Sequence, residues 1–237
     1  MSERIVLFLP NWIGDVVMAT PALRALRGYF ADAEITAVMK PYVAEVLAGT
    51  DWIDEKLFFN PRGKSPEQRT FRVAAELRRR RPDRAIMFTN SFRSAAMARW
   101  SGARHRVGYS RYGRGFLLSQ PLHAPRQGRI FTPVPAIDYF LGLAYAAGCP
   151  PESPRTELAT LPKDEAIADG VWQALEIERC KDVVVFNTGG AYGSAKHWPT
   201  EYYVELARRI VEREDAAVLV ICGPGERDNA AEIERSA

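Results

Sequence analysis

Short apolar runs alternate with amphipathic helical patterns along almost the whole chain. Strands are predicted at residues 5–9, 35–39, 85–89, 183–187 and 218–221. Helices, with apolar residues three and four positions apart, are predicted over 19–29, 66–81, 91–101, 136–147, 165–178 and 201–214. Strands that alternate with helices in this way favour parallel βαβ units. The sequence therefore predicts an α/β protein built on doubly wound sheets.

The chain is predicted to contain two domains. Residues 148–162 are dense in proline and polar side chains, as an interdomain linker would be. We therefore expect a first domain over 1–155 and a second over 163–237. The second domain has only two convincing strands, too few for a stable doubly wound sheet. We expect this chain to be the front part of a longer protein.

Composition favours a cytoplasmic protein that binds anions without a metal. Of the 237 residues, 47% are hydrophobic, yet no apolar stretch reaches the roughly 20 residues of a membrane span, and the N-terminus lacks a signal-peptide pattern. The three cysteines and three histidines show no disulfide or metal-ligand spacing, and no Asp-x-Asp pair occurs. A net charge of +3 and a pI near 8.8 favour anionic ligands without requiring nucleic acid.

Four consecutive arginines, Arg78 to Arg81, end a predicted helix just before Pro82. Cations complement the negative end of a helix dipole, and a proline stops the helix. We favour a solvated helix end for this run, with contact to an anionic membrane as the alternative.

The segment from Leu9 to Asp15 lies where the first predicted strand gives way to the first predicted helix. Ligands of open parallel sheets collect outside the carboxyl ends of the strands, so Asp15 is predicted to face a crevice where chemistry takes place. The alternative is a first-turn acid that only satisfies the helix N-terminus.

A second segment, residues 187–199, follows another apolar strand and carries three glycines and Lys196. Glycines let backbone N–H groups approach an anion, and a lysine adds a compact positive charge, so this loop is predicted to hold phosphate. It matches neither of the common nucleotide-binding glycine fingerprints. The alternative is a glycine-rich surface loop with an incidental lysine.

Two further segments follow predicted strands. Glu226, after the strand 218–221, suits either a ribose hydroxyl or a helix cap. Residues 89–94 and 104–109 bring arginines beside hydroxyl and amide groups, which suits a sugar that bears carboxylates or phosphates. Ser91 alternatively caps the next helix, and Arg104 and Arg106 are alternatively exposed turn charges.

Four ordered segments carry a family resemblance: residues 11–15, 90–94, 106–109 and 195–199. In this order they resemble the ADP-heptose:lipopolysaccharide heptosyltransferases, and the segment 90–94 looks most like heptosyltransferase II. The resemblance implies a GT-B architecture, in which two Rossmann-like domains bind acceptor and nucleotide sugar respectively. It also implies inverting transfer of heptose from ADP-heptose to a heptose hydroxyl of the lipopolysaccharide inner core, at the cytoplasmic membrane face.

The resemblance also assigns roles. Asp15 would be the general base, and Lys196 would stabilise the departing ADP. Catalysis would then need no metal. Donor binding is expected from Thr188, Gly189, Gly190, Lys196 and Glu226. Acceptor binding is expected from Asn11, Asn90, Ser91, Arg93 and Arg106.

One departure and two alternatives accompany these expectations. The family's later Asp-x-Gly-x-x-His segment is absent from this sequence, so we expect feeble ADP binding and little transfer from this chain alone. The alternatives are a GT-B transferase that uses another nucleotide sugar, and a noncatalytic fragment that binds an acidic glycan. A nicotinamide oxidoreductase is disfavoured, because the first strand-to-helix turn lacks the glycine fingerprint.

Overall fold

The computed structural model describes residues 2–128, 130–189, 197–214 and 216–237. The chain divides into two compact units, Met1–Leu161 and Pro162–Ala237, which we describe separately. In the described part of the chain, no helix is long and apolar enough to cross a membrane.

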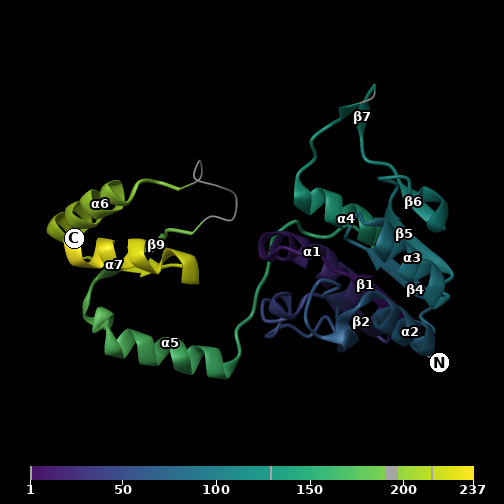
Figure 1. Cartoon of the computed structure of the whole chain (residues 1–237), viewed down its shortest axis with the longest axis horizontal. Coiled ribbons are helices and arrows are strands. Elements are labelled where there is room, and N and C mark those ends of the chain that lie inside the picture. The colour runs from purple at the N-terminus through teal and green to yellow at the C-terminus, as the bar shows by residue number, and fades with distance from the viewer. Residues whose placement is uncertain (1, 129, 190–196, 215) are drawn as a thin grey trace. The chain divides into compact units, whose positions relative to one another are not determined.

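The first unit is built on a six-stranded parallel sheet (Figure 1). Its strands are β1 (Arg4–Phe8), β2 (Glu34–Met39), β3 (Glu55–Phe58), β4 (Arg84–Met87), β5 (His105–Tyr109) and β6 (Gln120–Leu122), in the order β3-β2-β1-β4-β5-β6. A small antiparallel pair, β7 (Arg126–Gln127) and β8 (Ile130–Phe131), follows. The strand order reverses between β1 and β4, and a crevice opens at such a reversal in doubly wound sheets.

Helices cover both faces of this sheet. They are α1 (Ile13–Tyr29), α2 (Thr70–Arg80), α3 (Phe92–Ser101) and α4 (Ala136–Ala146), with short 3-10 turns η1 (Pro41–Val43), η2 (Pro66–Gln68) and η3 (Gly115–Leu117). The side chains of β1 alternate between the two faces: Ile5 and Leu7 pack with α1 and α4, whereas Val6 and Phe8 pack with α2 and α3. This burial on both faces explains why the strand reads as a continuous apolar run.

The segment predicted to be a linker, residues 148–162, belongs to the first unit as far as Leu161. Arg24 of α1 donates hydrogen bonds to the backbone carbonyls of Ser153 and Arg155 and pairs with the carboxylates of Glu152 and Glu157. The side chain of Arg24 is only 23% exposed, so these pairs are partly shielded from water. Residues 152–157 are thereby held along α1.

Among its described residues, the second unit contains two parallel strands, β9 (Asp182–Asn187) and β10 (Ala216–Ile221). Its helices are α5 (Pro162–Ala174), α6 (Thr200–Glu214) and α7 (Arg227–Ser236), with 3-10 turns η4 (Ile177–Arg179) and η6 (Pro224–Glu226). The strands pair in register from Asp182 opposite Ala216 to Asn187 opposite Ile221. The two strand ends therefore lie side by side, and the residues that follow them are brought together.

Candidate functional site

A cavity of about 430 Å³ lies at the reversal between β1 and β4. Residues that follow these two strands line it, together with aromatic residues from α4 and from the loop after β5. The lining residues are Pro10, Asn11, Trp12, Asp15, Phe88, Thr89, Asn90, Ser91, Tyr112, Tyr139 and Phe140. Four residues that the sequence singled out, Asn11, Asp15, Asn90 and Ser91, therefore meet in one place.

Asp15 is the third residue of α1 and is half-buried in this cavity. Among the residues that the structure describes, its carboxylate accepts no hydrogen bond and forms no ion pair. An acid in the first turn is favoured by the helix dipole without a direct bond. Both oxygens of Asp15 therefore remain available to a ligand's hydroxyl group.

Asn90 follows β4 and is held by two donors. The Oη of Tyr139 donates to Oδ1 of Asn90 at 3.2 Å, and Nη2 of Arg114 donates to the same oxygen at 3.1 Å. Since a guanidinium group can only donate, the amide must present its oxygen to Arg114. The NH₂ group of Asn90 is therefore the part left for a ligand.

Ser91 caps the next helix, which was the alternative role that the sequence offered, and it also lines the cavity. It is the N-cap residue of α3, and its Oγ accepts the backbone N–H of Ser94 at 3.1 Å. A serine N-cap satisfies one of the free donors at the start of a helix. Its hydroxyl therefore fixes the start of α3 beside Asn90.

Arg114 is one of two residues that sequence reasoning missed. It is fully buried, and its guanidinium group donates to the carbonyls of Tyr109 at 2.9 Å, Thr89 at 2.6 Å and Ser91 at 3.2 Å, besides Asn90. Burial lowers the pKa of Arg114 to about 10. The group therefore stays charged at neutral pH and fastens the turn after β4 to the end of β5.

Gly108 makes room for this arginine. A Cβ atom at Gly108 would lie 3.2 Å from Nη2 of Arg114, a contact that requires one of the two to shift. The glycine of the segment 106–109 therefore has a packing role beneath the cavity. Nothing around Arg114 in the sequence distinguishes it from an exposed loop arginine.

Lys40 was also missed, although its position after the strand 35–39 is a usable signal. It lines a small hollow of about 40 Å³ beside the main cavity, together with Asn11, Thr89 and Ser91. Lys40 thus adds a cation at a third neighbouring strand end, which suits an acidic ligand.

Two of the expected acceptor residues lie elsewhere. Arg93 is exposed in the first turn of α3 and does not line the cavity. Arg106 lies near the start of β5, at the amino ends of the strands and so away from the cavity. It donates to the carbonyls of Ala103 at 2.5 Å and Leu117 at 2.7 Å. Its side chain joins backbone segments, so the geometry gives it no contact with a ligand in this cavity.

The second unit brings together the described part of the expected donor site. Thr188 and Gly189 follow β9, and Glu226 follows β10. A Cβ atom at Gly189 would lie 3.1 Å from Oε2 of Glu226, which shows how closely the two segments approach. Gly190 and Lys196 lie outside the described residues.

Some polar groups of this constellation are already engaged. The N–H of Gly189 donates to Oδ1 of Asn187 at 3.1 Å, and Oε2 of Glu226 accepts the N–H of Gly223 at 2.7 Å. Glu226 thus acts as a local cap, the alternative that the sequence left open, through one carboxylate oxygen. The hydroxyl of Thr188 is buried and has no hydrogen-bond partner among the described residues.

We expect Thr188→Val to leave the stability of the second unit unchanged or to raise it by about 1 kcal/mol, because a buried hydroxyl without a partner is costly. Thr20→Val is the matched contrast, since the Thr20 hydroxyl donates to Val17 and accepts from Glu157. That variant should lose about 1–2 kcal/mol. Urea denaturation measures both, and a clear loss of stability in Thr188→Val would contradict the prediction.

No group of three or more His, Cys, Asp or Glu side chains that could hold a metal ion is found within the described ranges. The residues that gather at the two candidate sites are amides, hydroxyls, tyrosines and isolated acids.

The model of glycosyltransferase family 9 (heptosyltransferase) matches residues 70–237, more than half of the chain. The chain belongs to this family. Lipopolysaccharide heptosyltransferase 2 of Escherichia coli is 24% identical over 224 residues, and that of Salmonella typhimurium is 27% identical over 225 residues. Each match covers 91% of this chain and 62% of the relative, so the chain spans about 62% of the length of these relatives.

Solved structures agree on the fold. ADP-heptose lipopolysaccharide heptosyltransferase II of Escherichia coli superposes with a TM-score of 0.76 at 21% identity, over 99% of this chain and 69% of that one. A family 9 glycosyltransferase of Veillonella parvula superposes with a TM-score of 0.80 at 19% identity, over 99% and 67%. The expected α/β fold of the GT-B type is thereby confirmed, and this chain contains about two thirds of it.

Proposed function

We propose that this family 9 member acts in an inverting glycosyltransferase that transfers heptose from ADP-heptose to a heptose hydroxyl of a lipopolysaccharide inner core. The observation that most supports this proposal is the carboxylate of Asp15, which has no partner among the described residues and lies in the cavity between the ends of β1 and β4. A base must reach the proton it removes, and this carboxylate opens onto a space of sugar size beside Asn90. Both relatives are lipopolysaccharide heptosyltransferases, which supports heptose as the transferred sugar.

In this proposal Asp15 takes the proton of the acceptor hydroxyl as its oxygen attacks the anomeric carbon. The bond from that carbon to the ADP oxygen breaks, the electron pair leaves with ADP, and the configuration inverts. The NH₂ group of Asn90 and the cation of Lys40 orient an acidic acceptor.

On the donor side we assign the hydroxyl of Thr188, which has no partner among the described residues, to a diphosphate oxygen, and the second carboxylate oxygen of Glu226 to a ribose hydroxyl. As the family resemblance implies, Lys196 and the backbone near Gly190 would bind the diphosphate. Developing charge on ADP is then stabilised without a metal. The acceptor is carried on a membrane, so we place the reaction at the cytoplasmic membrane face.

A transfer assay tests the proposal directly. The chain, extended through the family's Asp-x-Gly-x-x-His segment that this sequence lacks, is incubated with a heptose-bearing lipopolysaccharide core and either ADP-heptose, ADP-glucose or UDP-N-acetylglucosamine, and the mass of the core is measured by mass spectrometry. We expect a gain of one heptose with ADP-heptose alone. A gain with another donor only would replace heptose in the proposal. Core binding without transfer from any donor would favour a glycan-binding role instead.

A further inference from the structure

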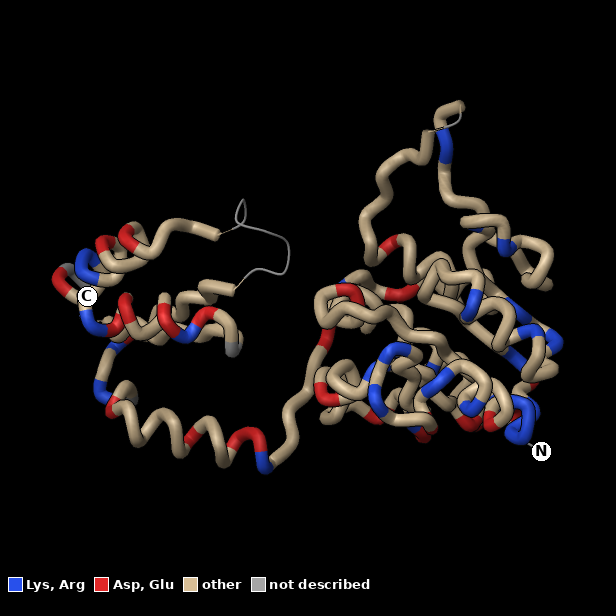
Figure 2. The backbone as a smooth tube through the Cα atoms, viewed as in Figure 1, with Lys and Arg blue, Asp and Glu red and all other residues tan. Residues whose placement is uncertain are grey.

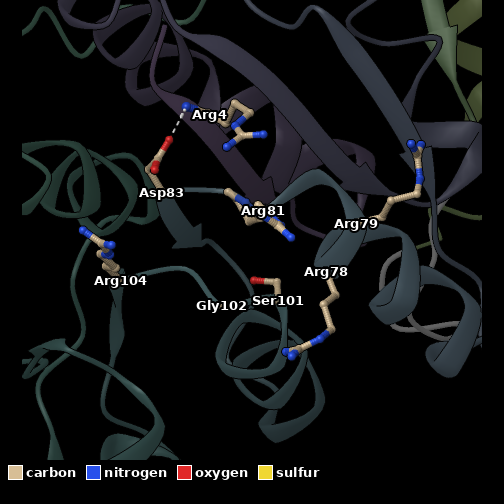
Figure 3. A pocket seen from close by; sticks show the side chains of 9 residues that line it. Arg4, Arg78, Arg79, Arg81, Asp83, Ser101, Gly102 and Arg104 are labelled. Carbon is tan, nitrogen blue, oxygen red and sulfur yellow. Dashed lines mark hydrogen bonds between the residues drawn. The ribbon is translucent and has the colours of Figure 1, made fainter. Parts of the chain in front are cut away.

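A second and larger hollow, of about 690 Å³, lies in the first unit at the amino ends of the strands of the same sheet (Figure 3). It forms where β1 and β4 begin and where α2 and α3 end, whereas the Asp15 cavity lies at the carboxyl ends of these strands. Its lining residues are Arg4, Arg78, Arg79, Arg81, Pro82, Asp83, Ser101, Gly102 and Arg104. In Figure 2 the blue end of α2 lies beside the N-terminus of the chain.

Arginines of the same run differ in their partners. Arg79 and Arg80 both pair with Glu76, and Arg80 pairs with Glu55 as well. Arg78 instead donates to the carbonyl of Trp100 at 3.0 Å. Arg79 and Arg80 are therefore paired with carboxylates, although Arg79 also lines the hollow, whereas Arg78 bonds only a backbone carbonyl.

Four arginines of the hollow have no carboxylate partner. Within the part of the chain that the structure describes, the guanidinium groups of Arg4, Arg78, Arg81 and Arg104 form no ion pair. The one acid in the lining, Asp83, accepts the backbone N–H of Arg4 at 2.9 Å. The ends of α2 and α3 each add about half a negative charge. These groups offset about half of the positive charge, so the hollow keeps a net positive potential.

Arg81 provides an independent observation. Its backbone is left-handed, with φ of 48° and ψ of 61°, at the C-cap of α2. Glycine adopts this conformation without the steric cost that a Cβ atom brings, and it is the usual residue there. The backbone N–H of Arg81 donates to the carbonyl of Leu77 at 3.2 Å, whereas its guanidinium group makes no hydrogen bond or ion pair among the described residues. Figure 3 shows the side chain between Arg4 and Ser101.

We propose that this hollow binds a phosphate-bearing anion of at least diphosphate size. Guanidinium forks match phosphate oxygens two at a time, and separated cations favour a ligand with several charged groups. The same chemistry is offered by a soluble diphosphate and by the headgroups of an anionic lipid. The site is distinct from the Asp15 cavity, and it does not depend on the proposed transfer reaction.

Calorimetric titration with pyrophosphate at low ionic strength tests the site. The triple variant Arg78→Gln, Arg81→Gln, Arg104→Gln should raise the Kd by roughly tenfold or more. The control Arg62→Gln, Arg69→Gln, Arg72→Gln removes the same charge from exposed arginines outside the hollow and should change the Kd less than about twofold. Equal weakening by both triples would overturn the proposal.

Vesicles separate the two sources of the anion. Sedimentation with phosphatidylglycerol vesicles and with neutral phosphatidylcholine vesicles is compared for the same three proteins. Loss of anionic-vesicle binding in the hollow triple alone identifies a lipid headgroup, whereas pyrophosphate binding without vesicle binding identifies a soluble ligand. Binding of neither probe by the unmodified protein would overturn the proposal.

Arg81→Gly distinguishes a binding role from a structural one. The variant removes one guanidinium group and relieves the left-handed backbone, so we expect weaker binding of whichever probe binds, with Tm unchanged or raised. If the side chain served only the fold, Tm would fall and the Kd would stay the same.

Discussion

In the chain extended through the family's Asp-x-Gly-x-x-His segment, replacing Asp15 with Asn is expected to lower the kcat of heptose transfer by about 10²- to 10⁴-fold, the usual contribution of a general base. Asn keeps the size and polarity of the side chain but cannot accept the proton in the transition state. The affinity for ADP should change less than about threefold, because the base acts on the acceptor hydroxyl. Steady-state kinetics of transfer and calorimetric titration with ADP measure the two effects.

Asp32→Asn is the matched control for this variant. Asp32 is exposed after α1 and makes no interaction among the described residues, so the same chemical change there should leave kcat unaltered. Loss of the Asp15 charge from the first turn of α1 costs only about 0.3–1 kcal/mol of stability. A parallel fall in kcat, ADP affinity and Tm would mean that Asp15 supports the helix and is not the base.

The part of the site that could be predicted follows from one rule of parallel sheets. The apolar runs before Asn11 and Asn90 identify two strands, and the carboxyl ends of neighbouring parallel strands meet at one edge. Their pairing is direct in the structure, where Phe8 lies opposite Met87. Because the rule depends only on where strands end, it predicts that Asp15 and Asn90 lie close together without any knowledge of side-chain contacts.

Short strands at and near the sheet edge gave no comparable signal. β3 reads Glu-Lys-Leu-Phe and β6 contains Pro121, which an edge strand tolerates because one side of it needs no hydrogen bond. β5 mixes His105 and Arg106 with glycine. The sequence predicts no strand over β5 and assigns Arg106 either to the acceptor site or to an exposed turn, whereas Arg106 lies near the start of β5, at the amino ends of the strands.

Buried polar architecture is the other part that the sequence does not reveal. Tyr109 and Tyr139 stack with ring centroids 3.7 Å apart, and burial raises the pKa of Tyr109 to about 12. Tyr109 in turn donates to the carbonyl of Tyr139 at 2.9 Å. These contacts join β5 to α4 across about 30 residues of sequence, and no local pattern encodes such a pairing.

Replacing Arg114 with Met is expected to destabilise the first unit by about 2–5 kcal/mol, through loss of donors to buried oxygens. Methionine fills a similar length but leaves the carbonyls of Thr89 and Tyr109 without the bonds that Arg114 supplies. For a unit of this size the Tm should fall by roughly 5–15 °C. Thermal unfolding followed by near-ultraviolet circular dichroism gives the value, and Arg62→Met, an exposed substitution, should stay within about 0.5 kcal/mol of the unmodified protein.

The same variant tests whether Arg114 positions Asn90. Without the guanidinium group, Asn90 keeps only Tyr139 as a donor to Oδ1, so the turn after β4 should open more often. Hydrogen exchange should then quicken at the backbone amides of the first turn of α3, while those of β1 change less. Arg114→Lys should be intermediate, since it retains the charge but not the planar fork that reaches several acceptors. If Arg114→Met proved as stable as the unmodified protein, the cost of burying the charge would equal what its hydrogen bonds return, and the arginine would serve to orient Asn90 without adding to stability.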